Sequence, residues 1–129
     1  MRIIDSSVIV KFFSKEPGWR SVKKYLLKPY TLELAVKELG NALWKKALKG
    51  EVSFKDAVEI IRGFKLIARF IKQDAVIERA FELALKYRIT LYDSLFIAAA
   101  EKTGATLVTC DSKQAEVARL LGLQVEQPE

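Results

Sequence analysis

Histidine is absent from this chain of 129 residues, and cysteine occurs once, as Cys110. Without histidine there is no Ser-His or Cys-His catalysis, no histidine proton shuttle and no zinc site that depends on imidazole. A single cysteine allows no intramolecular disulfide. Acid–base or metal chemistry must therefore come from Asp and Glu, whose oxygen ligands favour hard cations such as Mg²⁺ or Mn²⁺.

Long apolar runs are missing too, and none approaches the length that a helix needs to cross a bilayer. The first residues, MRIID, do not resemble a signal peptide, because an acid comes at position 5. We therefore expect a cytoplasmic protein without membrane contact. Half of the residues are hydrophobic and 29% are charged, which predicts a single globular domain over residues 1–129.

The net charge of +6 is compatible with a polyanionic partner. A basic protein with no such partner is an equal alternative on charge alone. A Walker A loop is absent and no glycine-rich loop follows a predicted strand, so the chain lacks the usual backbone cradle for a nucleotide.

Short apolar strands alternate with helices along the chain. Strands are predicted at 2–5, 105–110 and 123–127, with a weaker signal at 28–32. Helices are predicted at 6–13, 18–27, 33–49, 54–70, 75–87, 91–103 and 112–121. Few strands separated by helices predict an α/β fold with a small central parallel sheet and a helix-rich middle.

Two acids occupy the same relative place in this pattern. Asp5 and Asp111 are each the first acid after an apolar strand. In open parallel sheets, sites form beyond the carboxyl ends of the strands, near the point where the strand order reverses. If the two strands are parallel neighbours, both carboxylates lie at one edge of the sheet.

Two further acids lie on predicted helices. Glu38 has Leu34 and Leu39 near it rather than the lysines that dominate the end of its helix. Asp93 heads a helix with six consecutive apolar residues at 95–100. Burying carboxylates together raises their pKa values and costs several kcal/mol unless something compensates the charge. A divalent cation would provide that compensation.

Each of the four acids also has a purely structural explanation. Asp5 and Asp111 can cap the helices that follow them, and Thr90 with Asp93 has the spacing of a capping box. Glu38 can be a solvated residue on helix 33–49. Caps outnumber catalytic carboxylates, so this explanation is the stronger one for any single acid. The four acids together, without histidine, are better explained by a Mg²⁺ or Mn²⁺ site.

Two other acid-based folds fit the residues less well. A haloacid-dehalogenase-type phosphotransferase needs a second Asp two residues after the first, where this chain has Ser7. A response-regulator receiver domain has five strands that alternate regularly with helices. Residues 33–87 are too rich in helix to supply that pattern.

Four segments of the chain form a set: IIDSSVIV, ELAVKELGNALWK, LYDSLFIAAAEKTGATLVTCDSK and LGLQV. In their order and separation they resemble the PIN-domain family, in particular the VapC-type toxins of toxin–antitoxin pairs, over essentially the whole chain. The stretch from YDSLFIAAA to LVTCD is the most specific part. The resemblance implies a PIN-like three-layer α/β/α fold and a metal-dependent endoribonuclease.

The resemblance also implies roles for particular residues. Small polar positions of the family, which support the acids or a nearby water, correspond here to Ser7, Asn41 and Thr109. The acids that bind Mg²⁺ or Mn²⁺ and carry catalysis correspond to Asp5, Glu38, Asp93 and Asp111.

One segment departs from the family pattern. Some members carry another acid within a few residues of the last Asp, whereas Ser112, Lys113 and Gln114 follow Asp111 here. We therefore expect one firmly held cation and a second that arrives with the substrate.

An acidic site repels RNA, so basic side chains must hold the strand around it. Each candidate is, taken alone, an ordinary surface lysine, but as a group they form a reasonable set for phosphate contacts: Lys11, Lys45, Lys46 and Lys49. The resemblance further implies a homodimer face and a groove for an antitoxin protein on helices 18–27 and 54–87.

Two other functions stay open at this point. One is a housekeeping PIN nuclease that processes rRNA or tRNA. The other is a PIN-like RNA-binding or scaffold module without catalysis. The presence of all four acids argues against the second, because degenerate modules usually lose some of them.

Overall fold

The computed structural model describes residues 1–129 and contains one sheet of five short parallel strands. The strands are β1 (Arg2–Ile4), β2 (Tyr30–Leu32), β3 (Arg69–Ile71), β4 (Thr106–Val108) and β5 (Val125–Glu126). The α-helices are α1 (Ser6–Phe13), α2 (Leu34–Leu48), α3 (Phe54–Ile67), α4 (Ile77–Tyr87), α5 (Leu91–Thr103) and α6 (Ser112–Leu120), and two 3-10 helices are η1 (Trp19–Tyr25) and η2 (Gln73–Val76). None of these helices is both long enough and apolar enough to cross a bilayer.

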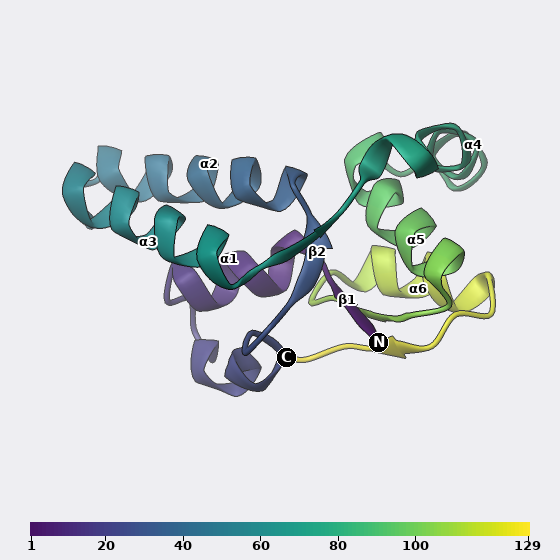
Figure 1. Cartoon of the computed structure of the whole chain (residues 1–129), viewed down its shortest axis with the longest axis horizontal. Coiled ribbons are helices and arrows are strands. Elements are labelled where there is room, and N and C mark those ends of the chain that lie inside the picture. Colours follow the sequence, from purple (N-terminus) through teal and green to yellow (C-terminus); the bar gives the residue numbers. More distant parts are fainter.

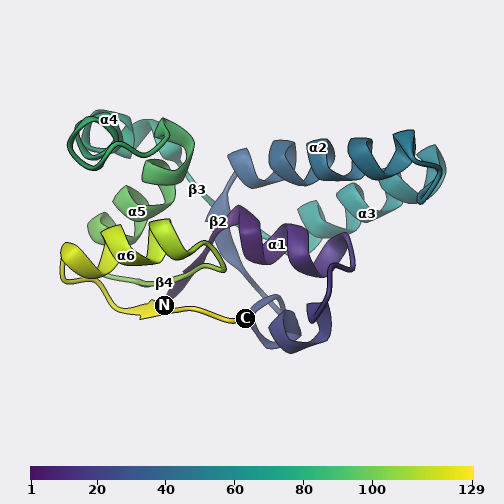
Figure 2. The same cartoon turned by 180° about the vertical axis from the view of Figure 1, so that it is seen from behind.

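Helices cover both faces of the sheet, as Figures 1 and 2 show from opposite sides. The strand order is β3-β2-β1-β4-β5. The chain runs outward from β1 to β3, crosses back and runs outward again from β4 to β5. Because such crossovers are right-handed, the reversal puts α1, α2 and α3 on one face and α4, α5 and α6 on the other. The predicted three-layer α/β/α fold is confirmed.

The core is built from the two central strands and the helix that packs across them. Ile3, Ile4, Leu107 and Val108 of β1 and β4 are buried, and in α5 every residue of 94–100 is buried. This burial explains the apolar run that the sequence shows after Asp93. It also fixes the first turn of α5 close to the ends of β1 and β4.

The sequence prediction is wrong at β3. It extends a helix over 54–70, but α3 ends at Ile67 and Arg69–Ile71 pairs with β2, with Phe70 opposite Thr31. β3 is a largely exposed edge strand of three residues. Residues 69–71 become a strand because they pair with β2, almost forty positions earlier in the chain. Such long-range pairing produces no periodic pattern of apolar residues in the local sequence.

Two predicted helices differ in type or start. The helix predicted over 18–27 is the 3-10 helix η1 (Trp19–Tyr25) rather than an α-helix, and Gly18 precedes it with φ of 79°. Val22 is its only buried residue, so no apolar stripe holds a longer helix against the core. The helix predicted over 75–87 begins instead at Ile77, after η2.

Candidate active site

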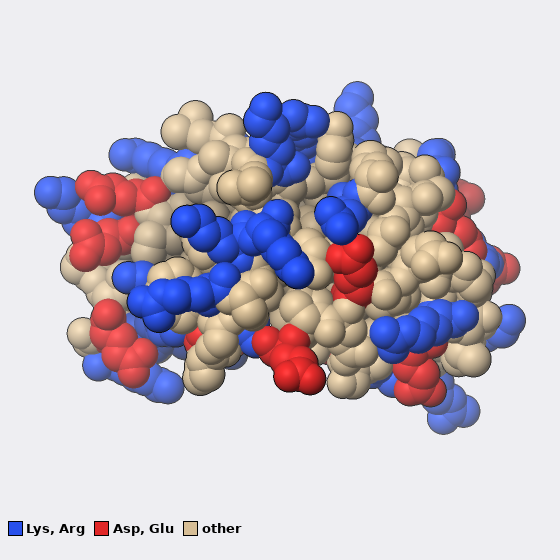
Figure 3. Space-filling model, turned by 90° about the horizontal axis from the view of Figure 1, so that it is seen from below, with Lys and Arg blue, Asp and Glu red and all other residues tan.

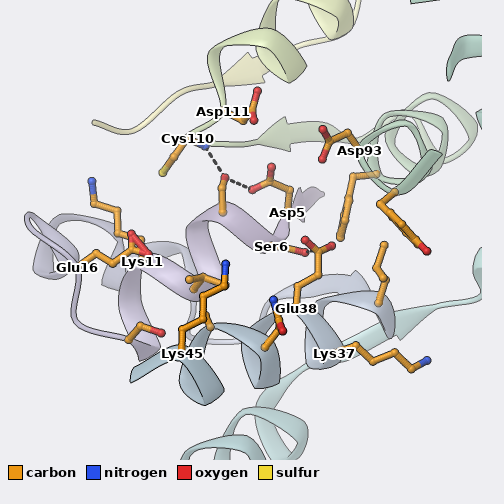
Figure 4. A pocket seen from close by; sticks show the side chains of 18 of the residues that line it. Asp5, Ser6, Lys11, Glu16, Lys37, Glu38, Lys45, Asp93, Cys110 and Asp111 are labelled. Atoms are coloured by element: carbon orange, nitrogen blue, oxygen red, sulfur yellow. Dashed lines mark hydrogen bonds between the residues drawn. The ribbon is translucent and has the colours of Figure 1, made fainter. Parts of the chain in front are cut away.

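A cleft of about 940 Å³ opens at the carboxyl edge of the sheet. All four predicted acids line it, as Figure 4 shows: Asp5, Glu38, Asp93 and Asp111. The first follows β1 and the last follows β4, which are parallel neighbours at the point where the strand order reverses. The other two come from α2 and from the first turn of α5, on opposite faces of the sheet.

Asp5 is the most buried of these acids, with 3% of its surface exposed. Its Oδ1 accepts hydrogen bonds from the Ser7 hydroxyl at 2.5 Å and the Val8 backbone N–H at 3.3 Å. Its Oδ2 accepts from the Thr109 hydroxyl at 2.5 Å, because Thr109 follows β4 in register with Asp5. Burial nevertheless raises the pKa of Asp5 to about 7, since desolvation outweighs these bonds.

Glu38 and Asp93 are both half-buried. Burial raises the pKa of Glu38, against a hydrogen bond of 2.9 Å from the Ser6 hydroxyl, and repulsion from Asp93 adds to the rise. Burial also raises the pKa of Asp93, and the charge of Asp111 raises it further. The acids therefore act on one another across the cleft.

The capping explanation is correct as well. Asp5 caps α1 through the Val8 N–H, and Asp111 caps α6 by accepting from the Gln114 backbone N–H at 2.9 Å. At α5 the Asp93 backbone N–H donates to the Thr90 hydroxyl oxygen at 3.1 Å. Capping and a role in the cleft are thus compatible, because the cap orients the carboxylate at the edge of the sheet.

None of the four acids has an ion-pair partner. The ion pairs of the protein are Arg2–Glu126, Arg79–Glu82 and Arg79–Glu101, all away from the cleft. A set of uncompensated carboxylate oxygens has the donor chemistry that suits a hard divalent cation. No three acidic or cysteine side chains, however, lie close enough here to hold one ion. Metal binding therefore needs the carboxylates to draw closer together.

The supporting polar residues differ in how they contact the acids. Ser7 donates to Asp5 and accepts from the Cys110 backbone N–H at 2.9 Å, so it joins β1 to β4. Thr109 contacts Asp5 directly and accepts from the Asp111 backbone N–H at 3.0 Å. Asn41 lines the cleft but makes no hydrogen bond to an acid.

The predicted RNA-contacting lysines are only partly in the cleft. Lys11, Lys45 and Lys46 line it, but Lys11 donates to the Glu129 carbonyl oxygen and Lys46 to that of Ser14. Lys49 lies just past the end of α2 and is not among the lining residues.

Several residues of the site were not predicted from the sequence. Ser6 bonds Glu38, and Lys37 lines the cleft one residue before Glu38. Gln114 is buried and bonds both the Thr109 hydroxyl and the Asp93 backbone. Ser6 and Lys37 adjoin predicted acids, which is a usable signal. Gln114 has no local signal, because its partners come from other elements.

The sequences of known proteins match this chain over most of its length. The PIN domain pattern matches residues 2–120. Ribonuclease VapC3 of Pyrobaculum aerophilum is 31% identical over 120 residues, which cover 88% of this chain and 92% of that protein. Exonuclease VapC9 of the same organism is 29% identical over 110 residues, which cover 84% and 79%.

A solved structure agrees with the fold. The crystal structure of PAE2754 from Pyrobaculum aerophilum superposes with a TM-score of 0.74 at 23% identity, over 96% of this chain and 87% of that chain. The three-layer fold, the pattern over residues 2–120 and the related sequences agree, and the chain belongs to the PIN-domain family.

Proposed function

We propose that this protein is a divalent-metal-dependent endoribonuclease and the toxin of a VapBC-type toxin–antitoxin pair. The observation that carries the proposal is that one cleft brings together Asp5, Glu38, Asp93 and Asp111, none of which has an ion-pair partner. Membership of the PIN-domain family and the ribonuclease named among its relatives support the choice of substrate.

The four carboxylates would hold Mg²⁺ or Mn²⁺. When bound, such an ion lowers the pKa of water and offsets charge on the phosphate oxygens. Asp5 has to be ionised to take part. Because its pKa is about 7, its ionisation in the free protein is incomplete at neutral pH. Ser7 and Thr109 hold its two oxygens in a fixed orientation through their hydroxyl groups.

Proton transfer would fall to the less enclosed acids. Glu38 and Asp93 are half-buried, line the cleft and have raised pKa values. A carboxylate with a raised pKa is a better acceptor for the proton of an attacking water. Direct attack by water leaves a 5′-phosphate and a 3′-hydroxyl on the RNA. No histidine is available to support cyclisation through the 2′-hydroxyl.

Lysines of α2 would hold the RNA backbone beside the acids. Lys37 and Lys45 line the cleft, and neither forms an ion pair with a carboxylate. Lys11 and Lys46 would exchange their backbone carbonyl partners for phosphate oxygens. Binding through these contacts weakens as salt rises, because cations displaced from the RNA are released to solution.

A homodimer and an antitoxin groove would use the apolar surface of α3 and α4. Large apolar side chains there are exposed rather than packed in the core: Phe54 by 84%, Leu66 by 86%, Phe81 by 58% and Leu85 by 68%. Exposed apolar side chains on each of these helices are typical of protein–protein contacts. Sedimentation of the wild type and of Phe81→Glu should show a dimer for the first and a monomer for the second.

The decisive experiment uses a circular RNA, which has no ends for an exonuclease. Purified protein should linearise it with Mg²⁺ or Mn²⁺, stop when EDTA is added, and leave 5′-phosphate and 3′-hydroxyl termini. Asp5→Asn and Asp93→Asn should each lower the cleavage rate by about a hundredfold or more. A wild-type rate of cleavage in EDTA or in either variant would exclude the metal mechanism. Degradation of linear but not circular RNA would replace the endonuclease by an exonuclease.

A further inference from the structure

Gln114 lies in the first turn of α6 with 1% of its surface exposed. Both ends of its side-chain amide are used. Its Nε2 donates to the Asp93 carbonyl oxygen at 2.8 Å, and its Oε1 faces the Thr109 hydroxyl at 2.8 Å. Its backbone N–H donates to the Asp111 carboxylate. One buried residue therefore contacts two segments that carry acids, the first turn of α5 and the connection from β4 to α6.

The chemistry of these partners fixes the direction of the amide. A backbone carbonyl only accepts hydrogen bonds, so the NH₂ group must face Asp93 and the amide oxygen must face Thr109. A carboxylate at this position could not donate to the carbonyl, and an apolar side chain could do neither. A neutral amide of this length contacts both partners.

Thr109 continues the connection to the most buried acid. Its hydroxyl has one hydrogen, which it donates either to Asp5 Oδ2 at 2.5 Å or to Gln114 Oε1 at 2.8 Å, and it accepts from the Asp111 backbone N–H. A continuous path of hydrogen-bond contacts thus runs from the first turn of α5, through Gln114 and Thr109, to Asp5 at the end of β1.

We propose that Gln114 is a positioning residue that holds the first turn of α5, and with it Asp93, in place against Asp5 and Asp111. The inference rests on the proposed function and names one more residue of the same site. The buried amide supplies this connection through its contacts with the Asp93 carbonyl oxygen and the Thr109 hydroxyl.

The test replaces Gln114 by Met, which keeps the length and most of the volume but removes both hydrogen bonds. Val117→Ala, on the same helix and also buried, is the matched control for lost packing. Isothermal titration with Mn²⁺ measures affinity without RNA, and cleavage kinetics measure kcat and KM. We expect Gln114→Met to lower Mn²⁺ affinity and kcat about tenfold, with KM unchanged. Val117→Ala should lower the melting temperature and leave Mn²⁺ affinity unchanged.

A double-mutant cycle with Thr109→Val separates positioning from general destabilisation. If Gln114 acts through Thr109, the double variant binds Mn²⁺ about as weakly as Thr109→Val alone. Fully additive losses, or wild-type Mn²⁺ affinity in Gln114→Met, would overturn this inference and leave the proposed function intact. A wild-type protein that neither binds Mn²⁺ nor cleaves RNA would overturn both.

Discussion

The two edges of the sheet are built from the same strands but differ in how their charged side chains are paired. At the carboxyl edge, Asp5 is buried without a Lys or Arg partner, and its pKa is raised. At the amino edge, Arg2 begins β1, and its guanidinium pairs at 3.0 Å with Glu126, the last residue of β5, and lowers the pKa of Glu126. Figure 3 views the molecule from below Figure 1, the side on which the N-terminus lies, and Lys and Arg side chains gather across its middle with acids among them.

This difference separates a surface arranged for stability from one arranged for a ligand. The Arg2–Glu126 ion pair is solvent-exposed, and each of its charges has its partner within the chain. The acids at the carboxyl edge are incomplete, because burial and mutual repulsion oppose their ionised forms. Such uncompensated charge is typical of functional sites, where a bound ligand supplies the missing partner.

The largest effect should come from removing one charge at the carboxyl edge. Asp93→Asn keeps the shape and the Thr90 cap, so we expect the fold to persist while RNA cleavage falls by about a hundredfold or more. Cleavage of a labelled RNA with Mg²⁺ and far-UV circular dichroism measure the two outcomes.

The matched control for this variant is Glu101→Gln. Glu101 lies on the same helix but pairs with Arg79 outside the cleft. It should keep full activity. If Asp93→Asn and Glu101→Gln lose activity equally, α5 tolerates no change of charge anywhere. The position of Asp93 at the carboxyl edge would then not explain its effect.

The next effect is on stability in the absence of metal. The pKa of Asp5 is about 7 in the folded chain against an ordinary value of 3.8 for a solvated Asp, so the folded state binds more protons between these two pH values. The free energy of unfolding of the metal-free protein should therefore fall as pH rises from 4 to 7. Asp5→Asn should remove much of this loss and raise the melting temperature at pH 8 by several degrees.

Thermal unfolding in EDTA at pH 5 and pH 8 measures this change, with the wild type as reference. Adding Mg²⁺ at pH 8 should stabilise the wild type and not Asp5→Asn, because only the ionised acid contributes to ion binding. A wild type whose stability is the same at both pH values would contradict the burial of an uncompensated Asp5.

A smaller effect should appear in the salt dependence of RNA binding. Lys45→Gln removes a cation from the cleft, and Lys28→Gln removes one at the amino edge. Measured in the Asp93→Asn background, the first should reduce the slope of log affinity against log salt by about 0.7, and the second should leave it unchanged. A reduced slope for Lys28→Gln would extend the RNA path to the amino edge.

The smallest effect is expected for the ion pair at the amino edge. Glu126→Gln should lower the free energy of unfolding by less than about 1 kcal/mol at pH 7, because exposed ion pairs contribute little. Its lowered pKa means that the stabilisation is present at neutral pH and lost in acid, opposite to the effect of Asp5. Urea unfolding at pH 7 and pH 3 measures both.

Much of the site could be anticipated because its acids stand at local boundaries. Asp5 and Asp111 follow apolar strands, and Asp93 begins a buried helix, so strand ends and caps marked them. Lysines were harder to place. The sequence predicts Lys37 and Lys49 on one helix, 33–49, but only Lys37 lines the cleft. Which side of a helix faces a cleft depends on how the helix packs.

The sequence by itself determined the class of fold, the enclosed helix α5 and the absence of imidazole chemistry, because periodicity, caps and composition are local properties. Tertiary packing sets the pairing of Arg69–Ile71 as β3, the 3-10 conformation of Trp19–Tyr25 and the contact of Gln114 with Asp93. These features depend on neighbours distant in the chain, whose positions are set only when the helices close on the sheet.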